Sequence, residues 1–352
     1  MDLLAAGAVP YPRGDDWVRG VSRSLKVLIT GGAGFIGSTV ASACIDAGIE
    51  PVIIDDLSTG REEFADGRAL YRGDIGDPAL VDRVVAEHPD ISIVIHCAAR
   101  IVVPDSVRGP LEYYEANVGK TIELLRSLRR NGIHRVIFSS SASVYDAEDG
   151  GAVTEDAPLA PSSPYARTKA MVEQILSDSA AAGELRAIAL RYFNPIGADP
   201  RARSGLQHRD PSHALGVLIS AYRRGGTFTI TGADWPTRDG SGLRDFIHVW
   251  DLARAHVRAV ERFDAVTEAD PFQVINLGGG TGTTVRELVS AFERVTGGSV
   301  DVTVGGRRPG DVAGAYADAG RAADVLDWRA ELTIDDGIRD SLAWAERFDP
   351  RS

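Results

Sequence analysis

Residues 26–37, with the sequence KVLITGGAGFIG, decide how this chain folds. They begin with a short apolar run, VLI, which is typical of a strand buried on both faces. The glycines Gly31, Gly34 and Gly37 follow in a G-x-x-G-x-x-G pattern, and an apolar stretch over 35–47 predicts a helix. Glycines let the backbone turn tightly and approach a ligand, and a helix N-terminus directs unpaired N–H groups and a positive dipole end at it. The segment therefore predicts a pyrophosphate site.

An acidic residue closes the second predicted strand. The apolar run 51–54 ends in Asp55, which follows Gly31 by 24 residues. A carboxylate at this place accepts hydrogen bonds from the adenine ribose diol and repels a 2′-phosphate, so it favours NAD over NADP. A glycine pattern alone is also common in ordinary strand–helix turns, but the strand before it and the helix after it favour a dinucleotide. We therefore expect NAD as the cofactor.

Composition excludes several classes of protein. The chain has 352 residues, 44% of them hydrophobic and 25% charged, as in ordinary globular proteins. Its net charge of −12 and the absence of a long basic run argue against nucleic acid or an anionic membrane as partner. The two cysteines, Cys44 and Cys97, cannot form a disulfide framework. The seven histidines lack metal-ligand spacing, since even His248 and His256 are eight residues apart, so we predict no metal site.

The start of the chain does not resemble a targeting segment. Residues 1–24 contain charged side chains and lack the apolar core of a signal peptide. The sequence also has no apolar run of about 18 residues that would span a membrane. We interpret 1–24 as an N-terminal extension and expect a cytoplasmic protein.

Strands and helices alternate through the first half of the chain. Apolar, β-branched runs such as 91–95 are followed by helical patterns such as 165–182, and 111–130 predicts one long amphipathic helix. This alternation predicts an α/β fold with a parallel, doubly wound sheet of the Rossmann type. Ligands of such sheets bind beyond the C-terminal strand ends, where the glycine turn, Asp55 and the serine run 139–141 fall.

The composition changes after residue 193. The loops 201–211 and 237–244 are polar and rich in Gly and Arg, and shorter strands and helices surround them. Thr284 and Glu287 predict a capping box at the start of one helix. We therefore predict an NAD-binding domain over 25–193 and a smaller α/β substrate domain, partly interleaved with the first, over 194–352.

Tyr165 and Lys169 stand as Y-x-x-x-K in the segment SPYARTK. On a helix these two positions share a face. A lysine ammonium beside a phenol favours the phenolate, which makes Tyr165 a candidate general base. Ser141, at the end of the preceding strand, could hydrogen-bond the same substrate oxygen. The pair could instead stabilise a surface helix, but its position after a dinucleotide turn and a serine run favours catalysis.

The chain resembles the extended short-chain dehydrogenases/reductases, and within them the UDP-glucose (UDP-galactose) 4-epimerases. The resemblance extends from Leu25 to about Ala343, and its later motifs are the more specific ones. In chain order the matching segments are GGAGFIG, DDLSTG, GDI, HCAA, YYEANV, SSSASVY, SPYARTK, RYFNPIGA, PTRDGSGLRDFIHV, NLGGG and RRPGDV.

The resemblance assigns roles to residues of this chain. It implies that Ser141, Tyr165 and Lys169 are catalytic and that the protein is a homodimer. The residues that it places against NAD are Gly31, Gly34, Phe35, Ile36, Gly37, Asp55, Leu57, Ser58, Thr59, Asp74, Ile75, Cys97, Ala98, Ala99, Asn117, Lys169 and Phe193. The residues that it places against a UDP-sugar are Ser141, Tyr165, Asn194, Arg244, Arg308, Asp311 and Ala315. The arginines suit a diphosphate because guanidinium groups pair with its oxygens in bidentate fashion.

Three positions depart from the pattern of the family. Ile101 stands where many members have a lysine, and Ser212-His213 replaces an asparagine pair that often holds UDP. Ala315 occupies a pocket-wall position where some members have tyrosine. In the family a small residue there goes with acceptance of N-acetylated UDP-hexosamines, so we expect this chain to accept them.

The resemblance therefore implies NAD-dependent 4-epimerisation of a UDP-hexose through a transient 4-keto sugar. An epimerase acting on UDP-uronates or UDP-pentoses is an alternative that the motifs hardly separate. A nucleotide-sugar 4,6-dehydratase is disfavoured because Ala142 and Ser143 stand where that reaction requires an Asp-Glu pair. A non-catalytic NAD-binding regulator is disfavoured because it has no need of both Tyr165 and Lys169.

Overall fold

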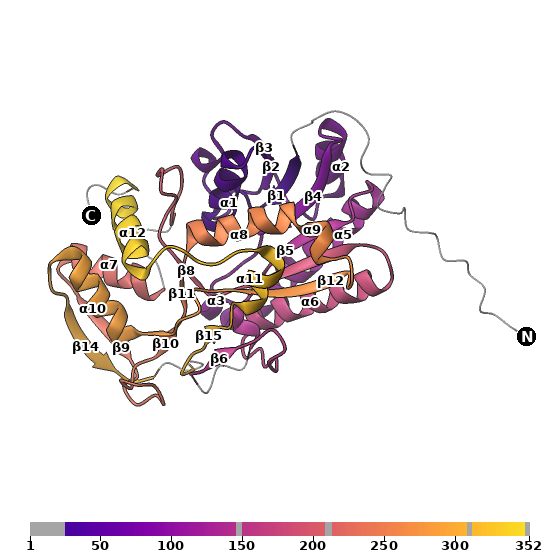
Figure 1. Ribbon diagram of the computed structural model, residues 1–352. Helices are drawn as coiled ribbons and strands as arrows, with labels where there is room; N and C mark the ends of the chain where they lie inside the picture. Colours follow the sequence, from indigo (N-terminus) through magenta and orange to yellow (C-terminus); the bar gives the residue numbers. More distant parts are fainter. Residues whose placement is uncertain (1–24, 146–149, 208–212, 308–311, 349–352) are drawn as a thin grey trace, which may run out of the picture.

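The computed structural model describes residues 25–145, 150–207, 213–307 and 312–348, so the predicted extension 1–24 lies outside it. A seven-stranded parallel sheet forms its centre, with strand order β12-β7-β5-β4-β1-β2-β3 (Figure 1). The order steps outward from β1 in both directions, which confirms the predicted doubly wound α/β architecture. The strands are β1 (Lys26–Thr30), β2 (Glu50–Asp55), β3 (Ala69–Arg72), β4 (Ile91–His96), β5 (Arg135–Ser141), β7 (Arg186–Tyr192) and β12 (Phe272–Leu277).

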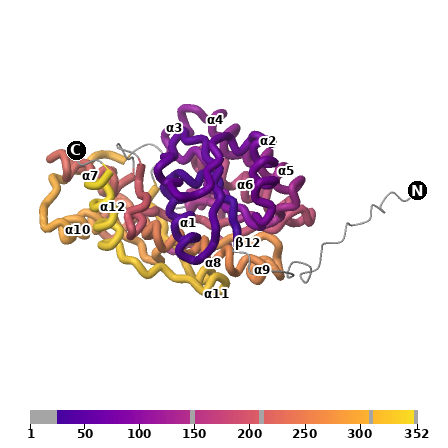
Figure 2. Tube along the Cα trace, turned by 90° about the horizontal axis from the view of Figure 1, so that it is seen from above, coloured from indigo at the N-terminus to yellow at the C-terminus, as the bar shows by residue number. Residues whose placement is uncertain are grey.

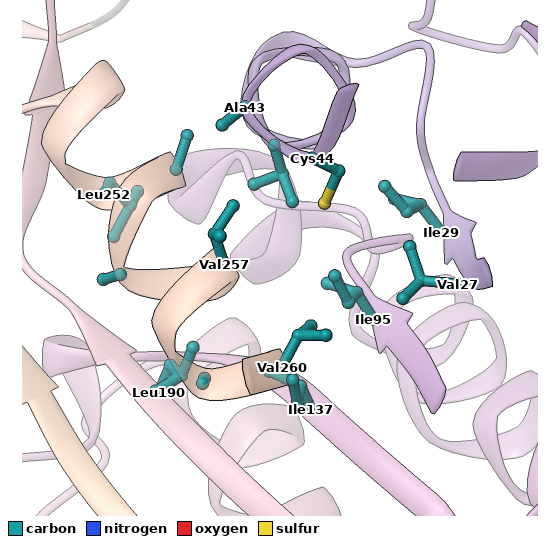
Figure 3. Close-up of a cluster of buried hydrophobic side chains, with 14 of the residues drawn as sticks. Val27, Ile29, Ala43, Cys44, Ile95, Ile137, Leu190, Leu252, Val257 and Val260 are labelled. Carbon is teal, nitrogen blue, oxygen red and sulfur yellow. The ribbon is translucent and has the colours of Figure 1, made fainter. Parts of the chain in front are cut away.

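Helices cover both faces of this sheet, because alternate residues of a buried strand point to opposite sides. In β1, Val27 and Ile29 belong to one core cluster and Leu28 to the other. Figure 3 shows the first cluster, in which Cys44 and Val257 lie between β1 and the helices α1 and α8. The helices of this layer are α1 (Phe35–Asp46), α8 (Val249–Glu261), α9 (Phe263–Val266) and α11 (Gly320–Leu326), and those of the opposite layer are α2 (Pro78–Glu87), α5 (Lys120–Arg130) and α6 (Pro164–Ala181).

The C-terminal half of the chain contributes both to this sheet and to a smaller cluster beside it. β12 and α8 belong to the main sheet and its helical layer, although they follow residue 193. The remaining elements pack around a third apolar cluster, and both views show α7, α10 and α12 to one side of the main sheet (Figures 1 and 2). These elements are α7 (Ala214–Arg224), α10 (Val285–Thr296), α12 (Ile334–Phe348) and the parallel pairs β8 (Asn194–Ile196) with β11 (Phe246–His248) and β9 (Thr227–Thr231) with β14 (Asp301–Gly305).

Two short pairings join distant segments near the sheet edge. β6 (Ala152–Val153) pairs with β15 (Tyr316–Ala317), and β10 (Leu243–Arg244) pairs with β13 (Thr283–Thr284). The capping box predicted from Thr284 and Glu287 is present at the start of α10, where each residue's side chain accepts a hydrogen bond from the other's backbone N–H group. Within the described ranges no helix combines the length and hydropathy that crossing a membrane requires.

The helix predicted over 111–130 is present, but a π-helical turn interrupts it. The segment contains the short helix α4 (Pro110–Tyr114), a π-helical turn over Glu115–Gly119, and α5. Another short helix, α3 (Val103–Arg108), precedes them. The segment stays helical through the π turn, so the sequence pattern predicts the helix but not the turn. Such turns are frequent at functional sites, and this one contains Asn117.

Candidate active site

The glycine turn after β1 is shaped by backbone packing. Gly31 has a φ of +69°, and a Cβ there would lie 2.7 Å from the backbone nitrogen of Ala98. A Cβ at Gly37 would overlap the carbonyl oxygen of Gly31. At Gly34 the nearest atom to a Cβ would be Gly31 O at 3.4 Å, an ordinary contact. The protein's own packing therefore requires Gly31 and Gly37, whereas Gly34 leaves open the space in front of α1.

The N-terminus of α1 is free of competing groups. Gly34 is its N-cap and provides no side-chain hydrogen bond, and the first turn, which starts with Phe35 and Ile36, contains no acidic residue. Four backbone N–H groups at a helix start lack intrahelical partners. Their positive end is therefore available to an anion, as the pyrophosphate prediction requires.

Asp55 lies at the C-terminal end of β2, 6% exposed. Its Oδ2 accepts a hydrogen bond from Ala33 N at 2.9 Å and its Oδ1 accepts one from Leu57 N at 2.8 Å. Burial raises the pKa of Asp55, while the two N–H groups act to lower it. Leu57 has a φ of +59°, a conformation uncommon for a residue with a side chain. The turn after β2 thus fixes the carboxylate at the strand end where a ribose diol would bind.

The next residues of this loop are exposed. The backbone N–H and the hydroxyl of Ser58 both donate to Asp56 Oδ1, at 2.9 and 2.6 Å. Thr59 O accepts a hydrogen bond at 3.1 Å from Gln207, which belongs to the C-terminal half. The loop after β2 is therefore attached to the segment that follows β8.

The loops after β3 and β4 approach the same edge of the sheet. Asp74 accepts hydrogen bonds from Gly76 N at 2.8 Å and from Lys120. The next residue, Ile75, is buried against α2. The backbone of Cys97, Ala98 and Ala99 follows β4 and borders Gly31.

Asn117 holds the loop after β4 in place. Its side-chain oxygen accepts from Arg100 N at 2.8 Å, and its amide nitrogen donates to Arg100 O at 2.9 Å and to Thr168 Oγ1 at 3.0 Å. The π turn therefore directs this buried side chain toward the loop and α6. Asn117 joins the predicted cofactor loop to the helix that carries Tyr165 and Lys169.

The three residues predicted to be catalytic lie together. Ser141 ends β5 and Tyr165 lies in the first turn of α6, where the Ser141 hydroxyl is near enough to influence the pKa of the phenol. The hydroxyl of Ser143 donates to Ser141 Oγ at 2.9 Å. Burial raises the pKa of Tyr165, and the nearby Ser141 hydroxyl counteracts that rise. The Ser163 hydroxyl accepts from Ala166 N at 3.1 Å and caps α6, which fixes where the helix begins.

Lys169 is buried beneath this pair. Its Nζ donates to Ser139 O at 2.6 Å and lies 4.8 Å from the centre of the Phe138 ring. The same Nζ lies 5.9 Å from the ring centre of Tyr165. Burial lowers the pKa of Lys169 to about 8. The lysine thus places a cationic group close to the phenol without bonding to it in this structure.

Further hydrogen bonds support β4, β5 and β7 beneath the predicted catalytic residues. The sequence patterns did not reveal them. The Ser139 hydroxyl donates to Cys97 Sγ at 3.1 Å and shares a hydrogen bond of 2.8 Å with the phenol of Tyr192. The phenol of Tyr192 in turn hydrogen-bonds to His256 of α8. Burial raises the pKa of the Cys97 thiol to about 11, so it is not a nucleophile at neutral pH.

A buried ion pair holds β5, α6 and β7 together behind the site. Arg191 donates to Glu173 Oε1 at 2.9 Å and to Oε2 at 2.6 Å, and Ser140 donates to the same carboxylate. Both charged residues are 4% exposed. A bidentate geometry with a further donor satisfies the buried charges, so this pair fixes the spacing of the strand ends that present Ser141 and Lys169.

Most of the residues predicted to bind the UDP-sugar belong to the C-terminal half of the chain. Asn194 begins β8 and is exposed, while Phe193 packs with Val144 and Ala317 in a small apolar cluster. Arg244 Nη1 donates to Leu243 O at 2.6 Å, and also contacts Ala313 O at 3.3 Å and Val312 O at 3.5 Å. Ala315 is half-buried in the segment that leads into β15. Arg308, Asp311 and Ser212 lie outside the described residues.

No cluster of three or more potential metal ligands occurs in the ranges that the structure describes. Ile101 is 57% exposed, on the loop that follows Ala99. Its side chain carries no charge, so it cannot make the cofactor contact that the resemblance assigns to a lysine at this position.

Known proteins resemble this chain over most of its length. Residues 27–278 match the family model described as the NAD dependent epimerase/dehydratase family. The chain belongs to this family. It is 44% identical over 324 residues to UDP-glucose 4-epimerase of Azospirillum brasilense, an alignment that covers 91% of this chain and 92% of that protein.

Solved structures agree with the family assignment. The UDP-glucose-4-epimerase of Stenotrophomonas maltophila, solved with bound NAD and formylated UDP-arabinopyranose, has a TM-score of 0.89 and 36% identity and covers 93% of this chain and 100% of that one. The UDP-glucose 4-epimerase of Bifidobacterium longum, solved in complex with NAD+ and UDP, has a TM-score of 0.83 and 36% identity and covers 92% and 98%. The predictions of an epimerase-type enzyme and of NAD as its cofactor are confirmed.

The residues of this epimerase fit NAD. A Cβ at Gly34 would meet only an ordinary contact, and the N-terminus of α1 would offer N–H groups to a pyrophosphate placed there. Asp55 offers a carboxylate to the ribose diol at the end of the adjacent strand. Both features lie at the edge of the sheet that carries Ser141 and Tyr165, so a bound dinucleotide would extend from Asp55 toward the phenol.

Proposed function

We propose that this protein interconverts UDP-glucose and UDP-galactose by inverting C4 of the sugar through a 4-keto intermediate. The observation that carries the proposal is the placement of Tyr165 and Ser141 near the buried Lys169, whose Nζ lies 5.9 Å from the Tyr165 ring centre, at the strand ends beside the glycine turn. A phenol and a hydroxyl that share one position can hold and deprotonate a single sugar hydroxyl. The similarity to UDP-glucose 4-epimerases over most of the chain supports this choice of substrate.

Tyr165 acts as the base in this scheme. Its phenolate accepts the proton of the sugar 4-hydroxyl, and the Ser141 hydroxyl orients that oxygen. Lys169 stabilises the phenolate because an ammonium favours a nearby negative charge. Bound NAD would supply the hydride acceptor and donor for C4, so the reaction would involve no net oxidation. After the 4-keto sugar turns over in the pocket, the Tyr165 phenol returns its proton to the oxygen of the opposite epimer.

The UDP moiety anchors the substrate while the sugar turns. Asn194 lies close to Arg244 in the fold, since Asn194 N donates at 2.9 Å to the carbonyl oxygen of Asp245, the residue after Arg244. Arg308 and Asp311, outside the described residues, complete the proposed set. Guanidinium groups suit the diphosphate, whose charge is far from the reacting carbon. The nucleotide thus provides most of the binding energy. The sugar itself can then be held loosely and present both of its faces to the cofactor.

Ala315 leaves room for a large C2 substituent. In β15, Tyr316 N donates to Gly151 O at 3.1 Å and Asp318 N donates to Val153 O at 2.9 Å, which fixes the register. Ala317 packs with Phe193 in the apolar cluster. Because side chains alternate along an extended segment, Ala315 points to the same side as Ala317, and Tyr316 points to the other. We therefore propose that UDP-GlcNAc and UDP-GalNAc are substrates as well.

The 4,6-dehydratase alternative has no structural support. Ala142 and Ser143 form a short 3₁₀ turn after Ser141, and Ser143 donates to Ser141 rather than offering an acid to C5. Neither side chain is a carboxyl group, so elimination across C5 and C6 lacks its acid and base.

A second copy of the chain is the proposed occupant of an apolar face. Val103, Val107, Leu111 and Met171 are 41–77% exposed and belong to α3, α4 and α6, which contact one another. Exposed apolar patches mark interaction surfaces, and a two-fold axis through this face would pair each helix with its copy. Light scattering would find a dimer for the wild type and a monomer for Leu111→Glu, and an unchanged mass of the variant would place the interface elsewhere.

A substrate panel tests the proposed function. The purified protein is incubated separately with UDP-galactose, UDP-GalNAc, a UDP-uronate and a UDP-pentose, and the products are identified by NMR. We expect C4 inversion of the hexose and of the N-acetylhexosamine. Turnover of the uronate or pentose alone would overturn the assignment of the substrate.

The variant Ala315→Tyr tests the pocket wall. A phenol at this position fills the space proposed for the N-acetyl group, so kcat/KM for UDP-GalNAc should fall at least about 100-fold while that for UDP-galactose changes little. The matched control is Tyr316→Ala, which alters the opposite side of the strand and should leave the ratio unchanged. Equal loss of both activities in Ala315→Tyr would contradict the placement.

A further inference from the structure

Asp245 is a fully buried carboxylate for which the proposed reaction has no direct use. Its hydrogen bonds come from backbone N–H groups of two separate segments. Oδ1 accepts from Gly279 N at 2.6 Å, and Oδ2 accepts from Ala317 N at 2.9 Å and from Gly280 N at 3.2 Å. Burying a carboxylate is costly unless its lone pairs are satisfied, so three converging donors indicate a dedicated structural link.

The surrounding backbone is packed too closely for side chains. A Cβ at Gly278 would overlap the carboxylate of Asp245, and a Cβ at Gly279 would lie 3.1 Å from its Oδ1. Gly314 has a φ of +115°, and a Cβ there would overlap the carbonyl oxygen of Leu243. The segments 243–245, 278–280 and 313–317 therefore meet backbone to backbone at Asp245.

Asp245 and its neighbours hold the segment 313–317 at both ends. Leu243 N donates to Ala313 O at 2.7 Å at the beginning of the segment, where Arg244 also contacts the carbonyl of Ala313. Asp245 binds Ala317 N at the end of the segment. Ala315, the proposed wall beside the C2 substituent of the sugar, lies midway between these two attachments.

We infer that Asp245 is a positioning residue for the sugar pocket, which fixes Ala315 through Ala317 and so sets the space for the C2 substituent. The inference rests on the proposed function and deepens it. Asp245 touches no substrate atom in this scheme and acts through the backbone that it holds. Discrimination between hexoses and N-acetylhexosamines should therefore depend on a residue outside the pocket lining.

The variant Asp245→Asn removes this link with little change in volume. An amide offers one acceptor oxygen and an NH₂ group, so at least one of the three backbone donors would face another donor. A matched control is Asp251→Asn. Asp251 is equally buried and accepts from the backbone N–H groups of Glu331 and Leu332 at 2.9 and 2.7 Å, but it holds a segment without predicted site residues.

The experiment measures KM and kcat for UDP-galactose and UDP-GalNAc in the wild type and both variants, together with NAD content. For Asp245→Asn we expect the ratio of kcat/KM for UDP-GalNAc to that for UDP-galactose to change about tenfold, mainly through KM. NAD content should stay at the wild-type level, because the glycine turn and Asp55 are not attached to this link. Asp251→Asn should lose thermal stability without a change in the ratio. An unchanged ratio in Asp245→Asn, or the same change in Asp251→Asn, would overturn the inference.

Hydrogen exchange supplies a second measurement that needs no turnover. In the wild type, the amides of 278–280 and 313–317 should open together, because one carboxylate holds both segments. Fast, independent exchange of 313–317 would overturn the inference even where Asp245→Asn does not fold. Absence of turnover by the wild type would instead contradict the proposed function, and the exchange data would still test the positioning role.

Discussion

At the scale of single residues, the ability of Tyr165 to act as a base depends on where the buried ammonium group of Lys169 is held. The Y-x-x-x-K spacing predicts that Tyr165 and Lys169 share a face of α6, and they do. Spacing cannot show that the ammonium is bound to Ser139 O, because that contact comes from a strand thirty residues earlier. This carbonyl holds the lysine at a fixed distance from the phenol, so the cation favours the phenolate without taking the place of the substrate.

Replacing Tyr165 tests the base. The variant Tyr165→Phe keeps the ring but loses the proton acceptor, so kcat should fall on the order of 100-fold or more while the affinity for UDP-sugar is kept. Steady-state kinetics and calorimetric titration with UDP-galactose measure the two quantities. Lys169→Met should resemble it, since the phenol loses its cationic neighbour. Near wild-type turnover in Tyr165→Phe would show that another group takes the proton.

At the scale of secondary-structure elements, sequence patterns predict those features that are determined by residues close together in the chain. The strand, glycine turn and helix around Gly31 are specified within a dozen residues, and the alternation that follows predicts the sheet. The π turn at Asn117, the pairing of β6 with β15 and the bonds to Asp245 depend on residues far apart in the chain. Periodic sequence patterns carry no information on contacts between distant residues. The sequence therefore suggested the candidate site residues but not the groups that hold them in place.

The three glycines of the turn should differ in their effects. In Gly34→Ala the new methyl group meets only an ordinary contact in the protein but enters the space proposed for the pyrophosphate, so the variant should fold and lose NAD. In Gly37→Ala the methyl group would overlap Gly31 O, so stability should fall as well, by about 1–3 kcal/mol. Urea unfolding and assay of the nicotinamide released on denaturation measure both effects. Normal NAD content in Gly34→Ala would contradict the proposed cradle.

At the scale of the whole molecule, two buried neutral histidines join layers of the fold. His96 at the end of β4 hydrogen-bonds to Thr30 Oγ1 at 2.7 Å and to Thr121 Oγ1 at 2.9 Å. His256 of α8 hydrogen-bonds to Leu252 O at 2.8 Å and to Tyr192. Burial lowers the pKa of His96 to about 3 and that of His256 to about 4. Both rings are therefore neutral in the folded protein at neutral pH.

These histidines make stability depend on pH. Below their ordinary pKa of about 6.5 the unfolded chain binds protons that the folded protein does not, so the free energy of unfolding falls as the pH falls toward 4. Each histidine contributes at most about 1.4 kcal/mol per pH unit in this window. Urea unfolding at several pH values between 7 and 4.5 measures the slope. His256→Gln should reduce that slope by one histidine's share, and an unchanged slope would show that His256 titrates normally in the fold.

The central claim is that hydrogen leaves C4 of the sugar and returns to the opposite face within one active site. The most direct test uses UDP-galactose that carries deuterium at C4 and purified protein without added NAD. The account predicts that UDP-glucose forms and keeps the deuterium at C4, which NMR reads directly. Formation of UDP-glucose with solvent hydrogen at C4, or no product from enzyme that holds its NAD, would contradict it.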